Sequence, residues 1–596
     1  MKTVPERIES LRSVLRAHGA QGCILPTSDP HMSEYVPAHW AARAYFSGFT
    51  GSAGTLCVTL DKAALWADGR YFVQAAHQLE GSGIELMRIG VAGTPKFADW
   101  MAENLADGAL VLADGATAPE ATCEQLERVF AKKGIRLECP DLLDEAWTED
   151  RTPAPATKAW LLDDAVAGRT AAEKLADVRK ALADADADTL VVSRLESTAW
   201  LTNLRADDIP HTPFALAFTL VTPESAELFI DAARVPADVQ EKLTAQGFAI
   251  RPYGEAAAAV RALEKGTALA EPAALSRALF AALRENSNIT VRTGRDPILL
   301  LKAVKNETER ECLKRAHVRD GLAMVKYIKR VTDAVAAGET LTEWDASQMS
   351  DAARREAPEC FDISFTTIAA YGPNAAMMHY APAPDTSAKL EPHGFLLTDC
   401  GGQYRDGTTD ITRTFALGPV TPDERRWYTL VLKCHIALAR AVFPEGTTGA
   451  QIDAIARDTL WRQGLDYRCG TGHGVGFVGG VHEGPQNVSP RGKEPLRAGM
   501  IVTDEPGVYE EDLVGIRTEN ELLCREWGET EYGRYLCFDV ITVCPIDTKP
   551  LDVALLTDDE LAWLNDYHKH VYETLAPKCT DDERAWLAAA CAEVVR

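Results

Sequence analysis

The feature that most constrains the fold of this chain is a glycine-rich stretch, TDCGGQYRDGTTDITRT, at residues 398–414. An apolar run, HGFLLTDCG, leads into it and predicts a strand, and the β-branched TTDITRTF predicts a returning strand. The three glycines between these segments allow the backbone to turn. Such a hairpin would bring Asp399 and Asp410 near one of its ends. The alternative is that both are ordinary turn-capping aspartates.

A second stretch, TDEPGVYEEDLVGIRTEN at residues 503–520, repeats this pattern of a Thr-Asp start, glycines near the turn and a β-rich return. Glu505 and Glu519 therefore occupy places comparable to the two aspartates, and the two hairpins predict a cluster of four carboxylates. Between them, in GTGHGVGFVGGVHEGP, His473 has a glycine on each side, which leaves its ring approachable.

Four carboxylates cannot share a pocket unpaired, because burying like charges costs several kcal/mol each or forces protonation. Two divalent cations would balance the four charges, and a bridging hydroxide could still be held. Ligation by oxygen atoms and a single imidazole favours hard or borderline ions such as Mn²⁺ over a sulfur-ligated Zn²⁺.

The chain of 596 residues is too long for one hydrophobic core. A Pro/Ala/Thr-rich segment at 149–158 predicts a linker, and a second break is expected near 293–306. Asn306 with Glu309 is a helix-capping signature. An apolar stripe follows it, formed by Leu313, Ala316, Met324, Ile328 and Val331.

The segments that begin near residues 15 and 180 both read as helix, loop, short buried strand and polar turn, which suggests a duplicated α/β domain. From residue 303 onward, long helices alternate with glycine-rich hairpins, as in an α+β domain. We therefore expect an α/β plus α+β protein with domains at 1–152, 153–302 and 303–596.

The net charge of −26 argues against a nucleic-acid or anionic-membrane partner, because both need clustered Lys and Arg. The N-terminus lacks the apolar core of a signal peptide, and the longest apolar runs are far shorter than a membrane span. Fourteen scattered cysteines without a CxxC motif are typical of reduced thiols. A cytoplasmic protein is the expectation.

Together with GPNAAMMHYAP at 372–382, these stretches resemble the catalytic domain of the pita-bread metallopeptidases, which include methionine aminopeptidase, prolidase and Xaa-Pro aminopeptidase. The resemblance implies two divalent metal ions per chain, with Mn²⁺ favoured and Zn²⁺ or Co²⁺ as alternatives, and a bridging hydroxide as nucleophile. It also implies that Asp410 bridges both ions whereas Asp399 binds one. The ligands it assigns are Asp399, Asp410, His473, Glu505 and Glu519.

The resemblance extends over nearly the whole chain. Residues 30–56 and 65–76 look like the first domain of the long, three-domain Xaa-Pro aminopeptidases, residues 199–213 like the second, and 298–311 like the entry to the third. It implies two related creatinase-like α/β domains before a pita-bread catalytic domain. The implied activity is release of the N-terminal residue from peptides with proline in second position, by a homodimer. A prolidase restricted to Xaa-Pro dipeptides and a non-catalytic binding relative are the alternatives.

The same resemblance places His379 and His482 beside the substrate and makes Glu505 the candidate proton shuttle. Tyr509 and Arg517 would line the prolyl side of the site. Their alternatives are a packing role for the tyrosine and a salt bridge to the carboxylates for the arginine.

One position departs from the family pattern. Relatives often carry a histidine where this chain has Cys469, four residues before His473. A thiol is a poorer hydrogen-bond donor, so any substrate contact at this position is in doubt. The alternative is an inert cysteine packed under the loop.

Overall fold

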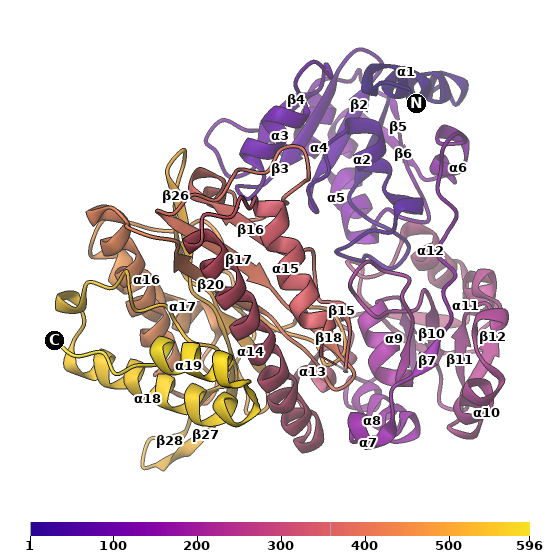
Figure 1. The fold of residues 1–596 in the computed structure, drawn as a ribbon. Helices are drawn as coiled ribbons and strands as arrows, with labels where there is room; N and C mark the ends of the chain where they lie inside the picture. The colour runs from indigo at the N-terminus through magenta and orange to yellow at the C-terminus, as the bar shows by residue number, and fades with distance from the viewer. Residues whose placement is uncertain (1, 358) are drawn as a thin grey trace. The chain divides into compact units, whose positions relative to one another are not determined.

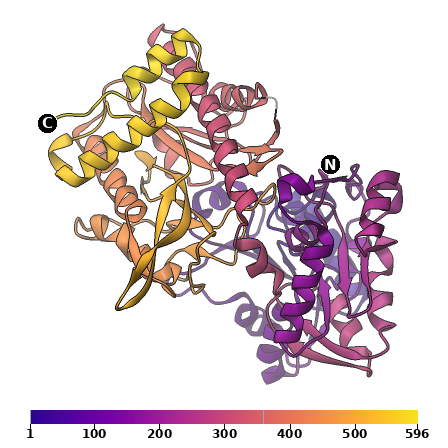
Figure 2. The ribbon, with the colours of Figure 1, turned by 90° about the horizontal axis from the view of Figure 1, so that it is seen from below.

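A computed structural model describes residues 2–357 and 359–596 of the chain. The chain divides into two compact units. The first unit comprises Met1–Asp164 and Arg169–Ile298, and the second comprises Ala165–Gly168 and Leu299–Arg596. Figures 1 and 2 trace the chain from indigo at the N-terminus to yellow at the C-terminus. Among the described residues, no helix combines the length and the apolarity that crossing a membrane requires.

The first unit contains two six-stranded sheets. One has the strand order β4-β3-β2-β1-β5-β6, with antiparallel β1–β2 and β2–β3 pairs and parallel pairs elsewhere. Its strands are β1 Gly22–Pro26, β2 Thr55–Thr59, β3 Ala63–Ala67, β4 Glu85–Arg88, β5 Leu110–Ala113 and β6 Arg136–Glu138.

The other sheet, β12-β11-β10-β8-β13-β14, repeats this order and these strand directions position by position. The duplicated α/β domain expected from the sequence is thereby confirmed. Its strands are β8 Thr189–Val192, β10 Phe218–Val221, β11 Ala226–Phe229, β12 Ala249–Arg251, β13 Gly266–Ala270 and β14 Ile289–Thr293, and a small separate pair is β7 Trp160–Leu161 with β9 Leu204–Arg205.

Helices pack on these sheets through apolar faces and give the first unit its own hydrophobic clusters. They are α1 Val4–Ala17, α2 Ala42–Ser47, α3 Phe72–Gln78, α4 Phe97–Glu103, α5 Glu120–Phe130, α6 Leu142–Ala146, α8 Ala171–Asp184, α9 Leu195–Thr202, α10 Ala237–Ala245, α11 Ala256–Arg261 and α12 Arg277–Glu285. The short helices α7 Asp164–Ala167 and α13 Ile298–Ala303 lie at the borders of the units.

The long helix α14, Glu307–Ala336, opens the main part of the second unit. Asn306 caps it, and Glu309 completes the predicted capping box. All five apolar residues of the predicted stripe are buried. Helices α18 and α19 pack against α14, as Figures 1 and 2 show in yellow beside its dark red. The other helices are α15 Glu343–Arg355, α16 Pro422–Ala439, α17 Gly449–Trp461, α18 Asp558–Leu575 and α19 Asp581–Ala590.

Two nested hairpins form the centre of this unit. Strands β17 Phe395–Cys400 and β20 Ile411–Ala416 pair antiparallel and enclose the inner pair β18 Gly402–Tyr404 and β19 Gly407–Thr408. Strands β24 Ile501–Asp504 and β27 Asn520–Thr530 enclose β25 Gly507–Glu510 and β26 Val514–Arg517 in the same way. The remaining strands are β15 Cys360–Ile363, β16 Ile368–Tyr371, β21 Val442–Pro444, β22 Gly472–His473, β23 Asn487–Val488 and β28 Gly533–Val540.

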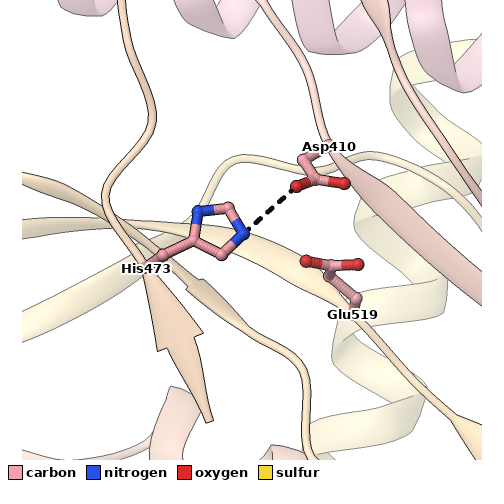
Figure 3. A group of neighbouring side chains, drawn as sticks. All are labelled: Asp410, His473 and Glu519. Carbon is pink, nitrogen blue, oxygen red and sulfur yellow. Dashed lines mark ion pairs between the residues drawn. The ribbon is translucent and has the colours of Figure 1, made fainter. Parts of the chain in front are cut away.

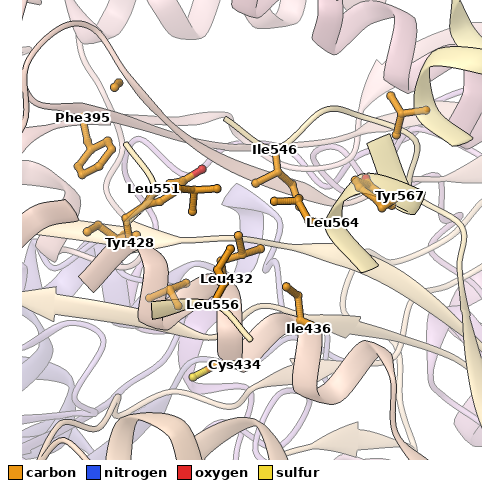
Figure 4. Close-up of a cluster of buried hydrophobic side chains, with 14 of the residues drawn as sticks. Phe395, Tyr428, Leu432, Cys434, Ile436, Ile546, Leu551, Leu556, Leu564 and Tyr567 are labelled. Carbon is orange, nitrogen blue, oxygen red and sulfur yellow. The ribbon is translucent and has the colours of Figure 1, made fainter. Parts of the chain in front are cut away.

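A large apolar cluster supports these hairpins from one side (Figure 4). Leu432 and Ile436 of α16 and Leu564 of α18 pack in it with Val508 and Ile516 of the inner hairpin. Because all five side chains are essentially inaccessible to solvent, a large-to-small change there would cost about 2–5 kcal/mol. The hairpins that carry the candidate site residues are therefore supported by a well-packed hydrophobic core.

The three-domain boundaries expected from the sequence stay a prediction. The border between the compact units falls after Ile298, close to the expected break after residue 302. The predicted linker at 149–158 has no helix or strand.

Candidate metal centre

The four predicted carboxylates lie where each outer strand pair gives way to its inner hairpin. Asp399 lies opposite Thr412 in β17–β20, and Asp410 directly precedes β20. Glu505 directly follows β24, and Glu519 directly precedes β27. The two nested hairpins lie side by side, because the Glu519 N–H donates a 3.1 Å hydrogen bond to the Thr412 carbonyl.

Three of the predicted ligands form a compact cluster, shown in Figure 3. One ligand atom each from Asp410, His473 and Glu519 lie within 4.8 Å of one another. His473 Nε2 is 3.4 Å from Asp410 Oδ2 and 3.6 Å from Glu505 Oε1. The predicted imidazole therefore meets acids from both hairpins at one point.

The ring of His473 is oriented by its backbone neighbours. Its Nδ1 is 3.0 Å from the Gly474 carbonyl oxygen. Because a carbonyl can only accept a hydrogen bond, Nδ1 must be the donor and carries the hydrogen. Its backbone N–H donates to Thr503 Oγ1 at 3.1 Å. This tautomer leaves the Nε2 lone pair of the neutral ring directed at the carboxylates, as metal ligation requires.

Two carboxylate oxygens in the site are buried without a hydrogen-bond donor, Asp399 Oδ1 and Asp410 Oδ1. A buried acceptor left unsatisfied costs about 1–3 kcal/mol, and more when it is charged. Divalent cations would satisfy both oxygens at once. The donor set, four carboxylates and one imidazole, fits such ions.

Burial and mutual repulsion of the carboxylates shift the pKa values of the cluster. Burial, together with the nearby Asp399 and Glu505, raises the pKa of Asp410 to about 7, although its hydrogen bond to His473 opposes this. Burial and the neighbouring acids raise the pKa of Glu519 well above its usual value. Burial disfavours the charged form of His473, but the hydrogen bond to Asp410 and the surrounding negative charges raise its pKa to about 9. The cluster attracts positive charge strongly.

Arg517 supplies one positive charge within the site. Its guanidinium donates to Asp399 Oδ2 at 2.5 Å, to the Tyr509 hydroxyl at 2.7 Å and to Thr412 Oγ1 at 3.1 Å. Arg517 therefore forms a salt bridge to one of the carboxylates, Asp399, which was the alternative interpretation of this residue. With the guanidinium counted, two divalent cations leave one positive charge, which a single anionic ligand would neutralise.

The two substrate histidines expected from the sequence lie on different loops. The His482 ring packs edge-on against His473, with ring centroids 4.2 Å apart at 85°. Half-buried His379 lies in the turn after the 3-10 helix η5, Gly372–Ala376. That helix packs closely on β26, since a Cβ added to Gly515 would lie 1.7 Å from the Ala375 carbonyl oxygen.

The departure at Cys469 leaves a neutral thiol beside the site. Burial raises its pKa to about 12, with the negative charge of Glu505 acting in the same direction. The side chain packs against the apolar cluster together with Tyr509. This environment matches the interpretation of an inert, packed cysteine.

Sequence reasoning missed three residues that support the ligands. Thr412 Oγ1 donates to Glu519 Oε2 at 2.6 Å. Glu521 Oε1 accepts from the Asp410 N–H at 2.8 Å, and its other oxygen is 3.3 Å from Nε2 of His317. Glu521 is the second residue of β27 and lies two residues after Glu519, a spacing that places side chains of an extended segment on the same face and could have indicated it. Nothing in the sequence around His317 indicates its contact, because it lies on a distant helix.

Comparison with known proteins identifies the class. A model described as metallopeptidase family M24 matches residues 311–526, and the C-terminal region of peptidase M24 matches 534–594. The creatinase/prolidase N-terminal domain matches twice, at 7–139 and 150–309. Fold and site thus define a metallopeptidase with a duplicated N-terminal domain.

Full-length relatives narrow this class. Aminopeptidase P2 of Arabidopsis thaliana is 39% identical and covers 96% of this chain and 86% of its own. A probable Xaa-Pro aminopeptidase P of Sordaria macrospora is 39% identical and covers 96% of both chains. The chain belongs to the aminopeptidase P group of metallopeptidase family M24.

Solved structures agree with this assignment. The X-prolyl aminopeptidase of Caenorhabditis elegans, described as a cytosolic enzyme with a di-nuclear active site, matches with a TM-score of 0.94 and 31% identity, covering 100% of both chains. A prolidase from Pyrococcus horikoshii matches with a TM-score of 0.51 and 23% identity over 63% of this chain and 99% of its own. This second match shows a shared fold.

Proposed function

We propose that this chain is a metal-dependent aminopeptidase that releases the N-terminal residue from peptides with proline in the second position. The observation that carries the proposal is the full-length similarity to the X-prolyl aminopeptidase of C. elegans. The prolidase fold corresponds to only 63% of the chain. This difference in coverage favours an aminopeptidase over the alternative, a prolidase that cuts only dipeptides.

The proposal includes two divalent cations per chain, with Mn²⁺ first and Zn²⁺ or Co²⁺ as alternatives. The buried, unpaired oxygens of Asp399 and Asp410 support it, as do the oxygen-rich donor set and the di-nuclear site of the C. elegans relative. Bound ions of this kind supply a nucleophile at neutral pH and polarise a carbonyl. The residues that would hold them are Asp399, Asp410, His473, Glu505 and Glu519.

The remaining roles belong to the side chains around these ligands. Half-buried Glu505 reaches both solvent and cluster, so it is suited to carry a proton from the nucleophile to the leaving amine. His482 and His379 would hold the substrate carbonyl oxygens. The hydrogen bonds of Arg517 and Tyr509 favour a role in fixing Asp399 over direct contact with the prolyl ring.

Peptide selectivity tests this function. The protein, loaded with Mn²⁺, should release arginine from an Arg-Pro-Pro peptide, read by mass spectrometry, and should leave an Arg-Ala-Pro peptide nearly uncut. Turnover of Xaa-Pro dipeptides alone would indicate the prolidase instead. Absence of any hydrolysis by the metal-loaded protein would favour the non-catalytic binding relative.

The role of His379 has its own test. His379→Ala should keep both metal ions and lose about 10²- to 10³-fold in kcat, the usual effect of removing one donor to a developing oxyanion. His393→Ala, at an exposed histidine beside Tyr371, is the control and should keep full activity. Full activity of His379→Ala would make this residue structural, and loss of metal would make it a ligand.

We also propose a cytoplasmic homodimer. The second unit has exposed large apolar side chains that a partner subunit would cover, Val442, Ile455 and Trp461, with exposed fractions of 46%, 38% and 48%. Light scattering of the purified protein should give about twice the 64.9 kDa chain mass. The chain mass itself would refute the dimer.

A further inference from the structure

The loop that carries His482, residues 476–485, is held in a strained conformation. Val478 within it has a φ of 47° and is completely buried. A β-branched residue avoids this left-handed region, and such strain costs on the order of 1–3 kcal/mol. It persists only where surrounding contacts impose it. Two sets of contacts do so here, one on each side of His482.

The first set comes from the inner hairpin between the two aspartates. Thr408 Oγ1 accepts a 3.0 Å hydrogen bond from the Gly479 N–H and donates a 2.9 Å bond to Gln403 Oε1. Gln403 Nε2 in turn donates to the Gly479 carbonyl at 2.8 Å. Both side chains are fully buried, so water does not compete for these hydrogen bonds. The backbone of Gly479 is therefore fixed through both its N–H and its carbonyl.

The second set comes from Lys302 on α13. Its Nζ lies 2.8 Å from Glu483 Oε1 and donates to the Gly484 carbonyl at 3.1 Å. The lysine side chain is 1% exposed and that of Glu483 is 8% exposed, so the ion pair is desolvated. Removing one partner of such a pair is much more disruptive than removing a surface ion pair.

The loop also closes against the segment that holds His473. The Glu483 N–H donates to the Gly474 carbonyl at 2.8 Å. A Cβ on Gly476 would lie 2.5 Å from Glu483 Oε2 and 2.8 Å from the Gly480 carbonyl oxygen, so any side chain here would displace Glu483 or the loop backbone. Movement of Glu483 therefore moves the loop relative to His473, against which the His482 ring packs.

We infer that Lys302 and the Gln403–Thr408 pair are positioning residues that hold His482 over the metal-ligand cluster. This inference rests on the proposed function, because it assigns His482 to the substrate. It also gives the inner hairpin between Asp399 and Asp410 a task beyond joining two ligand strands. A displacement of about 1 Å in a substrate-contacting group can cost about 10²-fold in rate.

Two substitutions test the inference, each with a matched control. Lys302→Met removes the ammonium and keeps the stem, and Lys174→Met is its control in the first unit. Lys174 is equally buried and donates to Trp200 O at 3.1 Å and Asn203 Oδ1 at 2.6 Å. Thr408→Val removes only a hydroxyl, and its control is Thr429→Val. The Thr429 hydroxyl is likewise buried, with partners Arg425 O and Asp552 N.

In the full chain loaded with Mn²⁺, Lys302→Met and Thr408→Val should lower kcat on an Arg-Pro-Pro peptide by about 10- to 100-fold, with unchanged metal content. Both controls should stay near wild type. A double-mutant cycle with His482→Ala gives the sharper result. If Lys302 acts through His482, Lys302→Met should have almost no effect in the His482→Ala background. Additive effects, or a wild-type rate, would overturn the inference.

Hydrogen–deuterium exchange supplies a readout that does not depend on activity. Amides of residues 476–486 should exchange about tenfold faster in Lys302→Met and Thr408→Val than in the wild type or the controls. Unchanged exchange would overturn the inference even if the rates fell. If the wild type cleaved no peptide, the proposed function would fail while exchange still decided whether these residues hold the loop. Should Lys302→Met not fold, the isosteric Thr408→Val carries the same prediction.

Discussion

At the scale of single residues, two carboxylates of the site are paired through only one of their oxygens. Asp399 is held from one side by Arg517, and Asp410 from one side by His473, while the other oxygen of each is buried without a donor. Asp320, also buried in the second unit, differs from them, because Arg354 donates to both of its carboxylate oxygens. The contrast separates a site designed for cations from an ordinary buried ion pair.

Substitution of Asp410 tests this distinction. Asp410→Asn keeps the size but removes one charge and replaces one oxygen with an amide nitrogen that is a poor ligand. We expect about one Mn²⁺ per chain instead of two, and activity lower by several orders of magnitude, with an unchanged circular dichroism spectrum. Metal stoichiometry by mass spectrometry gives the result.

Asp406→Asn is the matched control for that experiment. This aspartate lies in the same hairpin, but Arg319 and Arg315 pair with it, so its substitution should leave both ions in place. Two retained ions and normal turnover in Asp410→Asn would return Asp410 to the role of a turn aspartate.

The pKa values predict how the metal-free protein binds Mn²⁺ as pH changes. Ligands must lose their protons, and the pKa values of Asp410 and His473 are raised to about 7 and about 9 in the metal-free cluster. At pH 7 binding should therefore release protons, chiefly from His473 and in part from Asp410, and the raised pKa of Glu519 acts in the same direction. Affinity should fall as pH falls through 7, by about tenfold per pH unit for each proton released.

Titration calorimetry in two buffers of different ionisation enthalpy measures this release directly. Equal heats in both buffers, or an affinity that does not change between pH 6 and 8, would contradict the prediction. A variant such as Asp406→Asn, altered outside the cluster, should show the same proton release as the wild type.

At the scale of elements, the sequence was sufficient to predict those helices, caps and strands that depend on interactions between residues close in the chain. The capping pair Asn306–Glu309, the buried stripe of α14 and the outer strands around Asp399 and Asp410 were all predicted and are confirmed. The pairing of β18 with β19 inside that hairpin was not predicted. The contacts that Gln403 and Thr408 make with a loop more than 70 residues away were not predicted either, because no local pattern reports such a contact.

The cap of α14 gives a prediction at this scale. Asn306 Oδ1 accepts from the Glu309 N–H at 3.0 Å, and its amide donates to the Ala167 carbonyl at 2.9 Å. Asn306→Ala should therefore destabilise the second unit by about 1 kcal/mol, within the usual range for a lost cap. Asn306→Asp, which keeps the capping oxygen, should lose less. Chemical denaturation measures both, and equal losses would show that the bond to Ala167 matters more than the cap.

At the scale of the whole molecule, the chain places all its predicted metal ligands in one of two units that have separate hydrophobic clusters. The sequence predicted a break near residues 293–306, where duplicated α/β segments give way to long helices and glycine-rich hairpins, and the border between the units lies in that region, after Ile298. It could not predict which contacts tie Ala165–Gly168 to the second unit. Those contacts are tertiary, such as the bond from Asn306 to Ala167.

This division predicts how metal affects thermal stability. A ligand that binds only the native state stabilises by about 2.7 kcal/mol at 100 times its Kd and about 4.1 kcal/mol at 1,000 times. Because the ligands lie only in the second unit, that gain should appear in one unfolding transition and leave the other unchanged. For a unit of this size, the shift should be at least several degrees. Scanning calorimetry with Mn²⁺ and with a chelator should therefore show one metal-dependent and one metal-independent transition. Asp410→Asn should reduce the shift, and equal shifts of both transitions would contradict the prediction.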